Sequence, residues 1–162
     1  MKKTAIYAGT FDPVTYGHID VIKRALSIFD GLYVVVASSV RKTPLFTVKE
    51  RVHFIRKATA DLPNVTVEAY DGLVVEYAKA KGARAMIRGL RAISDFDYEF
   101  QMTLMNRKLS EEIQTIFLMP SEQHFYLSSA LVKEVAWYGG HRLRGLVPAF
   151  IEKELARRIR KT

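Results

Sequence analysis

The sequence predicts a single doubly wound α/β domain, in which a five-stranded parallel sheet carries helices on both faces. Three observations lead to this fold class. Segments with strand-like and helix-like periodicity alternate from one end of the 162 residues to the other. The second strand, residues 32–37, is a near-continuous apolar run, which is typical of a strand covered on both faces. No linker, repeat or low-complexity tract breaks the alternation, so residues 1–162 are expected to form one domain.

The elements of the first half can be recognised in order along the chain. Residues 4–8 form a short apolar strand, and apolar side chains then recur at helical spacing over residues 19–29 until Gly31 interrupts them. After the second strand and a polar loop, Thr47 and Glu50 have the spacing of a capping box, which indicates that a helix begins there.

The second half continues the same alternation. Pro148 suits the first turn of the last helix, because the N–H that proline lacks would have no partner there. The expected elements are strand 65–70, helix 73–81, strand 85–87, helix 94–109, strand 115–119, helix 129–137 and a basic helix over about 148–161.

The charge balance favours a polyanionic partner. The net charge is +8, from 25 basic and 17 acidic residues, which is compatible with nucleic acid or with phosphorylated small molecules. Residues 141–162 hold seven basic residues against two acidic ones, so most of the excess lies in this C-terminal segment, which contains the last helix, rather than on a sheet face with interleaved aromatics. This distribution favours a solvated helix, and we expect no specific nucleic-acid partner.

Several classes of protein are disfavoured by what the sequence lacks. No apolar run approaches the ~18 residues of a membrane span, and the N-terminus leads into the first strand without a cleavable apolar region. There is no cysteine, which excludes disulfides and cysteine-ligated zinc. We therefore expect a cytoplasmic protein with no membrane partner.

The stretch from Thr10 to His18 is the most informative part of the sequence. It follows the first strand and opens the first helix. Gly17 and His18 place a small backbone and an imidazole where a phosphate can approach, and a helix N-terminus adds unpaired N–H groups and a partial positive charge. This combination indicates nucleotide chemistry.

Polar side chains also follow the other strands, at the sheet edge where doubly wound proteins bind ligands. No carboxylate pair or cluster joins them, and a donor-rich, acid-poor site suits a triphosphate. Neither a P-loop nor a dinucleotide fingerprint is present, which weakens kinase and NAD-binding interpretations. The residues at this edge are Thr10, His18, Ser38, Ser39, Arg41, Lys42, Arg88, Gly89, Leu90, Arg91, Ser128 and Ser129.

Each of these residues also has a structural interpretation. His18 could be an ordinary residue of the first helical turn, and Arg88 and Arg91 could be surface residues on a loop. Ser128 and Ser129 could cap the following helix, a role compatible with holding a phosphate. The apolar and aromatic residues over 96–105 are expected to belong to the core or to an interface rather than to a cofactor site, and the other three histidines show no metal-ligand spacing.

These residues and their surroundings resemble the phosphopantetheine adenylyltransferase family from about Thr4 to Pro148. The wider nucleotidyltransferase superfamily is marked by a T/H-x-G-H motif, here residues 15–18. The more specific matching segments are Gly9–Pro13, Ile87–Arg91, Met105–Arg107, Phe117–Pro120 and Ser128–Ala136. The resemblance implies a Rossmann-like nucleotidyltransferase fold and the reversible reaction of ATP with 4′-phosphopantetheine to give dephospho-coenzyme A and pyrophosphate, the penultimate step of coenzyme A synthesis.

The resemblance also implies roles for the catalytic residues. His18 and Thr10 would contact the α-phosphate and stabilise the transition state. Lys42 would orient the attacking phosphate, while Arg91 and Ser129 would hold the leaving β- and γ-phosphates. Because the attacking phosphate is largely dianionic near neutral pH, with a second pKa of about 6, the reaction needs no general base.

The remaining implied contacts divide into an acceptor side and an ATP side. On the acceptor side, Thr10, Lys42 and Arg88 would lie near the phosphate and Val74 along the pantetheine arm. The ATP side would also comprise Phe11, Gly89, Leu90, Glu99, His124, Phe125, Tyr126, Leu127, Ser128 and Ala130. Mg²⁺ is expected on the ATP phosphates with few protein ligands. Family members are usually homohexamers under feedback by coenzyme A, and residues 96–105 could supply such contacts.

Two positions depart from the family pattern. Many relatives have a third small hydroxyl residue where Ala130 stands, and an aromatic residue is common near His124. The alternative function is that of a related nucleotidyltransferase acting on nicotinamide mononucleotide or a polyol phosphate. Those groups typically carry histidine where this chain has Thr15.

Overall fold

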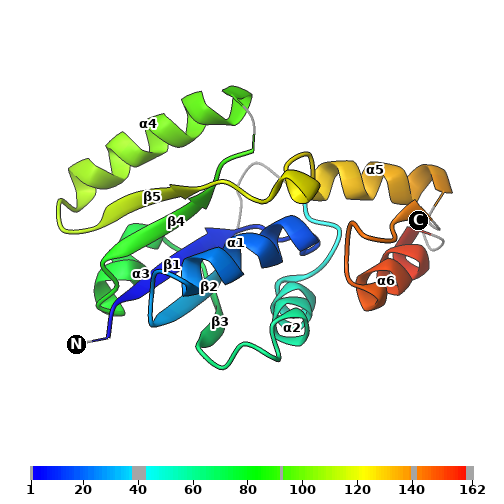
Figure 1. Cartoon of the computed structure of the whole chain (residues 1–162), viewed down its shortest axis with the longest axis horizontal. Helices are drawn as coiled ribbons and strands as arrows, with labels where there is room; N and C mark the ends of the chain where they lie inside the picture. Colours follow the sequence, from blue (N-terminus) through cyan, green and yellow to red (C-terminus); the bar gives the residue numbers. More distant parts are fainter. Residues whose placement is uncertain (1, 38–42, 92, 140–141, 160–162) are drawn as a thin grey trace.

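A computed structural model describes residues 2–37, 43–91, 93–139 and 142–159 and contains the predicted five-stranded sheet (Figure 1). All strand pairs are parallel, and the order across the sheet is β3-β2-β1-β4-β5. The strands are β1 (Thr4–Gly9), β2 (Gly31–Ala37), β3 (Val65–Tyr70), β4 (Ala85–Gly89) and β5 (Gln114–Leu118). The helices are α1 (Tyr16–Leu26), α2 (Val48–Ala58), α3 (Val74–Ala80), α4 (Ile93–Leu109), the short 3₁₀-helix η1 (Glu122–His124), α5 (Ser129–Gly139) and α6 (Ala149–Ile159).

The strand order creates a crevice at the centre of the sheet. From β1 the chain proceeds to β2 and β3 on one side, and it then returns to place β4 on the other side of β1. Connections leaving the carboxyl ends of β1 and β4 therefore diverge, which is the arrangement that opens a ligand site in doubly wound sheets. The fold places the first loop, residues 10–15, at this point.

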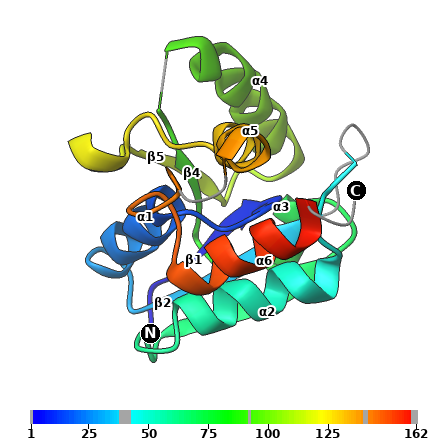
Figure 2. The ribbon, with the colours of Figure 1, turned by 90° about the vertical axis from the view of Figure 1, so that its right-hand side faces the viewer.

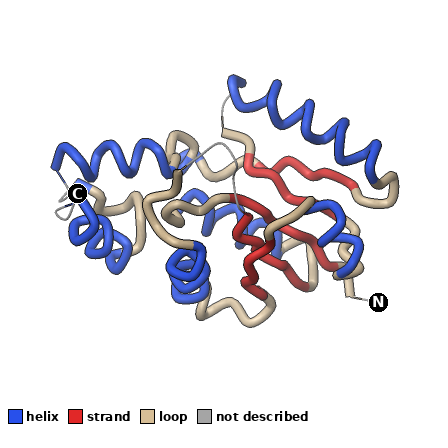
Figure 3. Tube along the Cα trace, turned by 180° about the vertical axis from the view of Figure 1, so that it is seen from behind, coloured by secondary structure: helices blue, strands red, loops and turns tan. Residues whose placement is uncertain are grey.

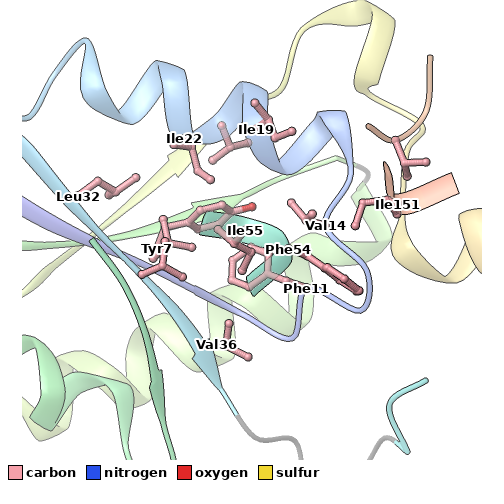
Figure 4. Packing of buried hydrophobic residues seen from close by; sticks show 14 of the residues in the cluster. Tyr7, Phe11, Val14, Ile19, Ile22, Leu32, Val36, Phe54, Ile55 and Ile151 are labelled. Carbon is pink, nitrogen blue, oxygen red and sulfur yellow. The ribbon is translucent and has the colours of Figure 1, made fainter. Parts of the chain in front are cut away.

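Helices cover both faces of the sheet, as predicted (Figure 3). On one face, Tyr7 and Val34 pack against Ile22 of α1 and Ile55 of α2 in the larger apolar cluster, part of which Figure 4 shows. The opposite face forms a smaller cluster, in which Ile6 belongs to the same group as residues of α3. Burial on both faces explains why the central strands are continuous apolar runs.

Several element boundaries differ from the predicted ones. Helix α1 ends at Leu26, so Ile28 and Phe29 lie beyond the helix to which the periodicity assigned them. Strand β4 continues through Arg88 and Gly89, which pair with Phe117 and Leu118 of β5, instead of ending at Ile87. Helix α5 extends two residues past its predicted end, and η1 was not predicted. The capping box of Thr47 and Glu50 is confirmed. The described part of the last helix is Ala149–Ile159, and residues 160 and 161 lie outside the described residues.

Helix α4 lies along the β5 edge, on the side of the molecule opposite α2 and α6 (Figures 1 and 2). The sequence left open whether its apolar residues belong to the core or to an interface. In this chain they are not core residues, because the exposed fractions of Tyr98 and Met105 are both 53%. The exposed apolar side chains of α4 are Phe96, Tyr98, Phe100, Met102, Leu104, Met105 and Leu109.

Within the described ranges, no helix combines the length and the apolar character that crossing a membrane would require.

Candidate active site

A pocket of about 710 Å³ opens at the carboxyl ends of the central strands. Its walls come from the first loop, the end of β4, the start of α4 and the start of α5. The predicted site residues that line it are Thr10, Phe11, His18, Val74, Arg88, Gly89, Arg91, Glu99, Leu127, Ser128, Ser129 and Ala130. Segments separated by more than 100 residues in sequence therefore meet in one cavity.

His18 is fixed by a capping box at the start of α1. The Thr15 hydroxyl accepts a hydrogen bond from the His18 backbone N–H, and the Thr15 backbone N–H donates to Nδ1 of His18 at 3.0 Å. These two bonds give Thr15 and His18 of the T-x-G-H motif a local structural role. They orient the imidazole ring, and the ring also lines the pocket.

The same contacts determine how His18 can interact with a ligand. Since Nδ1 accepts the Thr15 N–H, the neutral ring carries its proton on Nε2. Burial and the nearby positive charge of Arg91 lower the pKa of His18 to about 3. The side chain is therefore a neutral hydrogen-bond donor at physiological pH, which suits an anionic phosphate oxygen without requiring a proton transfer.

The first loop has an unusual backbone at Phe11. Its φ of 49° lies in the left-handed region, which a bulky residue adopts only where the surroundings enforce it. The buried Phe11 ring meets Tyr7 and His18 edge-on, with centroids 5.2 and 5.0 Å away. This packing gives the imidazole a contact in addition to its hydrogen bonds with Thr15.

Arg88 and Glu99 form a bidentate ion pair in the pocket wall. Nε and Nη2 of Arg88 each donate to a Glu99 oxygen at 2.6 Å, and Nη1 donates to the Ala8 carbonyl at 3.1 Å. Burial alone would lower the pKa of Arg88, but the hydrogen bonds and negative charge of Glu99 outweigh it, so this pKa is raised. The pair fixes a guanidinium at the pocket and links β4 to α4.

The start of α5 forms another wall of the pocket. The Ser128 hydroxyl accepts the Leu131 N–H at 3.0 Å, which confirms the capping interpretation for Ser128, and the Ser129 hydroxyl donates to the Pro13 carbonyl at 2.8 Å. In a helix the first N–H groups have no intrahelical partner, so those of α5 can bind an anion at the pocket. Arg91 donates to the Leu127 carbonyl at 2.9 Å beside them.

The pocket contains two carboxylates, of which the sequence interpretation included Glu99 but not Asp12. Asp12 and Glu99 both line it, but each is neutralised, Asp12 by Lys133 at 2.8 Å and Glu99 by Arg88. The sequence interpretation expected no carboxylate pair at this edge, whereas the structure places these two carboxylates in the lining, each engaged by a cation. Across the described ranges, no three His, Cys, Asp or Glu side chains are grouped to hold a metal ion.

Some predicted ATP-site residues do not line the pocket. Leu90 donates its backbone N–H to the Leu118 carbonyl along the β5 edge. His124 ends η1, with its Nδ1 2.9 Å from the Ser121 hydroxyl, and Phe125 and Tyr126 are exposed. Ser38, Ser39, Arg41 and the predicted catalytic Lys42 lie outside the described residues.

Other pocket residues were missed by the sequence interpretation. Tyr7 lies within a strand that otherwise indicates only core, and burial raises its pKa. Tyr98 and Lys133 lie on helices, where their spacing does not distinguish a pocket-facing side chain from a solvated one. Of the missed pocket residues, Asp12 alone had a signal in the sequence, because it belongs to the Gly9–Pro13 segment that matches the family pattern.

Comparison with known proteins gives the family. The cytidylyltransferase-like family model matches residues 6–135. A curated phosphopantetheine adenylyltransferase from Thermodesulfovibrio yellowstonii (strain ATCC 51303 / DSM 11347 / YP87) is 56% identical over 162 residues, covering 99% of this chain and 100% of the relative. The chain belongs to the phosphopantetheine adenylyltransferase family. The resemblance noted from the motifs is thus confirmed over nearly the whole chain.

Solved structures support the fold. A candidate nicotinate-nucleotide adenylyltransferase from Vibrio parahaemolyticus has a TM-score of 0.70 at 19% identity, covering 100% of this chain and 98% of the other. A bifunctional NMN adenylyltransferase/ADP ribose pyrophosphatase from Francisella tularensis has a TM-score of 0.64 at 15% identity, covering 86% and 43%. At these identities the likeness concerns the nucleotidyltransferase-like fold alone.

Proposed function

We propose that this protein transfers the adenylyl group of ATP to 4′-phosphopantetheine, forming dephospho-coenzyme A and pyrophosphate in a reversible reaction. The observation that carries this function is the 56% identity to a phosphopantetheine adenylyltransferase over 99% of the chain. The pocket supports it, because imidazole, guanidinium and helix N–H donors converge where phosphates would bind.

The reaction is a single displacement at phosphorus. An oxygen of the 4′-phosphate attacks the α-phosphorus of ATP, and a new P–O bond forms to that oxygen. The bond between the α-phosphorus and the bridging oxygen to the β-phosphate breaks, and pyrophosphate leaves with the electron pair. The attacking oxygen is already ionised, so no protein base has to remove a proton.

The donors of the pocket suit the charge that develops in this step. His18, neutral and protonated on Nε2, would bind the α-phosphate together with the Thr10 side chain. Arg91 and the first N–H groups of α5 would hold the leaving β- and γ-phosphates. Ser129 contributes through its backbone in this arrangement, since its hydroxyl donates to Pro13.

The acceptor would lie against the wall formed by β4 and α3. Arg88 would compensate the charge of the 4′-phosphate, and its pairing with Glu99 keeps the guanidinium in place. Val74, at the start of α3, would contact the pantetheine arm. Lys42 is proposed to orient the attacking phosphate, on the strength of the family pattern alone.

Magnesium is proposed as a phosphate-bound ion. The donor set of the pocket fits this arrangement better than a protein-held metal, because both carboxylates that line it are engaged by Arg88 or Lys133. Mg²⁺ readily keeps most of its waters and binds substrate phosphates. Bound in this way, it would neutralise part of the triphosphate charge.

The biological context is also proposed from the family. We infer a homohexameric cytoplasmic enzyme that is subject to feedback by coenzyme A. The exposed apolar side chains of α4 support self-association, since many exposed apolar residues on one helix commonly mark a protein interface. The same helix contributes Tyr98 and Glu99 to the pocket, so assembly and the site share an element.

Product analysis tests the function. With ATP, Mg²⁺ and 4′-phosphopantetheine, mass spectrometry should detect dephospho-coenzyme A in amounts equal to the pyrophosphate released. His18→Ala should lower kcat by ~10²-fold or more, the usual effect of removing a donor to the transition state. Formation of AMP or ADP without dephospho-coenzyme A would contradict the proposal, as would an unchanged kcat in the variant.

A further inference from the structure

Two charged residues, Asp12 in the pocket lining and Arg51 on α2, have no assigned contact with the substrates and yet are almost completely buried. Asp12 is 3% exposed and Arg51, on α2, is 2% exposed. Burying an ionised group is unfavourable unless the protein satisfies its hydrogen bonds. Their partners therefore indicate what they hold in place.

The Asp12 carboxylate is occupied by protein donors on both oxygens. Oδ2 accepts the Leu45 N–H and the Lys133 ammonium, each at 2.8 Å, and Oδ1 accepts the Phe46 N–H at 2.9 Å. Asp12 therefore joins three segments, namely the first loop, the residues before α2, and α5. With its oxygens engaged in this way, it is suited to act on the reaction through its neighbours rather than by contact with a substrate.

Arg51 closes a ring with the same residues. Its Nε donates to the Phe46 carbonyl at 3.1 Å, and its Nη1 donates to the Thr10 carbonyl at 2.7 Å. The peptide groups of Phe46 are thus tied to the first loop twice, through Asp12 at its N–H and through Arg51 at its carbonyl. The ring consists of Thr10, Asp12, Phe46 and Arg51.

The strained residue of the loop lies inside this ring. Phe11, with its φ of 49°, is flanked by Thr10, whose carbonyl is held, and by Asp12, whose side chain is held. A left-handed backbone at a bulky residue persists only where several contacts enforce it. Thr10 and Phe11 both line the pocket, so the ring fixes the backbone of two pocket-lining residues.

We propose that Asp12 is a positioning residue for the adenylyl transfer, and that with Arg51 it holds the Thr10–Phe11 backbone in the shape the reaction requires. The inference rests on the proposed function for the identity of the reaction. It assigns Asp12 and Arg51 a role distinct from global stability, because the groups they bind are those of the loop that would meet the α-phosphate.

Asp12→Asn tests the role. The Asn side chain keeps one acceptor oxygen, but its NH₂ group would face N–H donors that now bind the other carboxylate oxygen. We therefore expect kcat to fall by roughly 10- to 100-fold. The KM values should stay within about threefold, because the substrate contacts themselves remain. Hydrogen exchange of peptides covering residues 9–14 should become faster. In a Thr10→Ala background the same substitution should change kcat by less than about threefold, since residues that act as a unit are not additive.

Glu68→Gln is the matched control. Glu68 is a partly buried acid on β3 that does not line the pocket, and it accepts hydrogen bonds from Tyr77 and from Lys81 at 3.0 Å. Its substitution should lower stability without changing kcat or the exchange of residues 9–14. If Asp12→Asn does not fold, Arg51→Lys replaces it, because a single ammonium cannot span both carbonyls.

The outcomes separate this inference from the proposed function. Wild-type protein that makes no dephospho-coenzyme A would overturn the proposed function. Active wild-type protein with an unchanged kcat in Asp12→Asn and Arg51→Lys would overturn the positioning role. A fall in kcat that is fully additive with Thr10→Ala, or that Glu68→Gln reproduces, would also overturn it.

Discussion

At the scale of single residues, His18 shows how a helix cap can become part of a site. The Thr15 N–H holds Nδ1, which leaves Nε2–H as the donor, and burial together with Arg91 keeps the ring neutral. A neutral donor stabilises developing negative charge without a change of its own protonation state. The proposed role of His18 therefore depends on the orientation of its ring and does not require a pKa near 7.

The dependence of activity on pH follows from this state. With a pKa of about 3, His18 is unprotonated at Nδ1 over the whole working range. We expect kcat/KM for 4′-phosphopantetheine to rise as its phosphate loses its second proton near pH 6, and then to stay level to about pH 8.5. Initial rates measured at fixed ionic strength test this. A falling limb with an apparent pKa near 6.5 would show that a protonated His18 is required.

Stability should depend on pH through the same group, with the sign given by linkage. The unfolded chain binds a proton on this imidazole below about pH 6.5, whereas the folded chain does not until about pH 3. The contribution of His18 therefore disfavours folding progressively as the pH falls from 6.5 toward 3.

The sequence was sufficient for the local part of the site and insufficient for the part formed by long-range contacts. Thr10 and His18 could be identified because the loop and the helix start are contiguous. The cap itself went unnoticed, since histidine is not the Glu or Gln of the usual capping box. Asp12 and Lys133 are 121 residues apart, and no periodicity predicts that they meet.

At the scale of elements, the strand order was not needed to locate the site, because every parallel strand delivers its loop to the same edge. The strands could be predicted from their apolar runs, and the carboxyl-end edge of the sheet followed from their parallel arrangement. The end of β4 could not be predicted, because Arg88 and Gly89 are not typical strand residues and are held in the sheet by pairing with β5. The three residues of η1 are too few to produce a periodic pattern.

Helix α4 leads to a prediction about assembly. Wild-type protein should elute as a species larger than a monomer, and Leu104→Glu should shift it to smaller species, because a charge at a buried apolar contact is unfavourable. Light scattering coupled to size exclusion measures this. Ile28→Glu is the control, since the exposed fraction of Ile28 is also 53% but the residue lies just after α1. An equal mass for wild type and Leu104→Glu would contradict the interface.

At the scale of the whole molecule, the positive charge has a more specific distribution than composition suggests. The basic last helix was interpreted as a solvated surface, yet Arg158 pairs with Glu50, donates to the Leu45 carbonyl at 3.2 Å and lies over the Phe46 ring. It braces the residues that Asp12 holds. Part of the basic excess is therefore structural, and the pocket carries its own cations, Arg88, Arg91 and Lys133.

The choice of acceptor is the most direct test of the function. Purified wild-type protein is given ATP and Mg²⁺ with either 4′-phosphopantetheine or nicotinamide mononucleotide, and pyrophosphate release is followed at equal acceptor concentrations. We expect turnover with 4′-phosphopantetheine and none above background with the mononucleotide. Turnover of the mononucleotide without turnover of 4′-phosphopantetheine would contradict the proposed function.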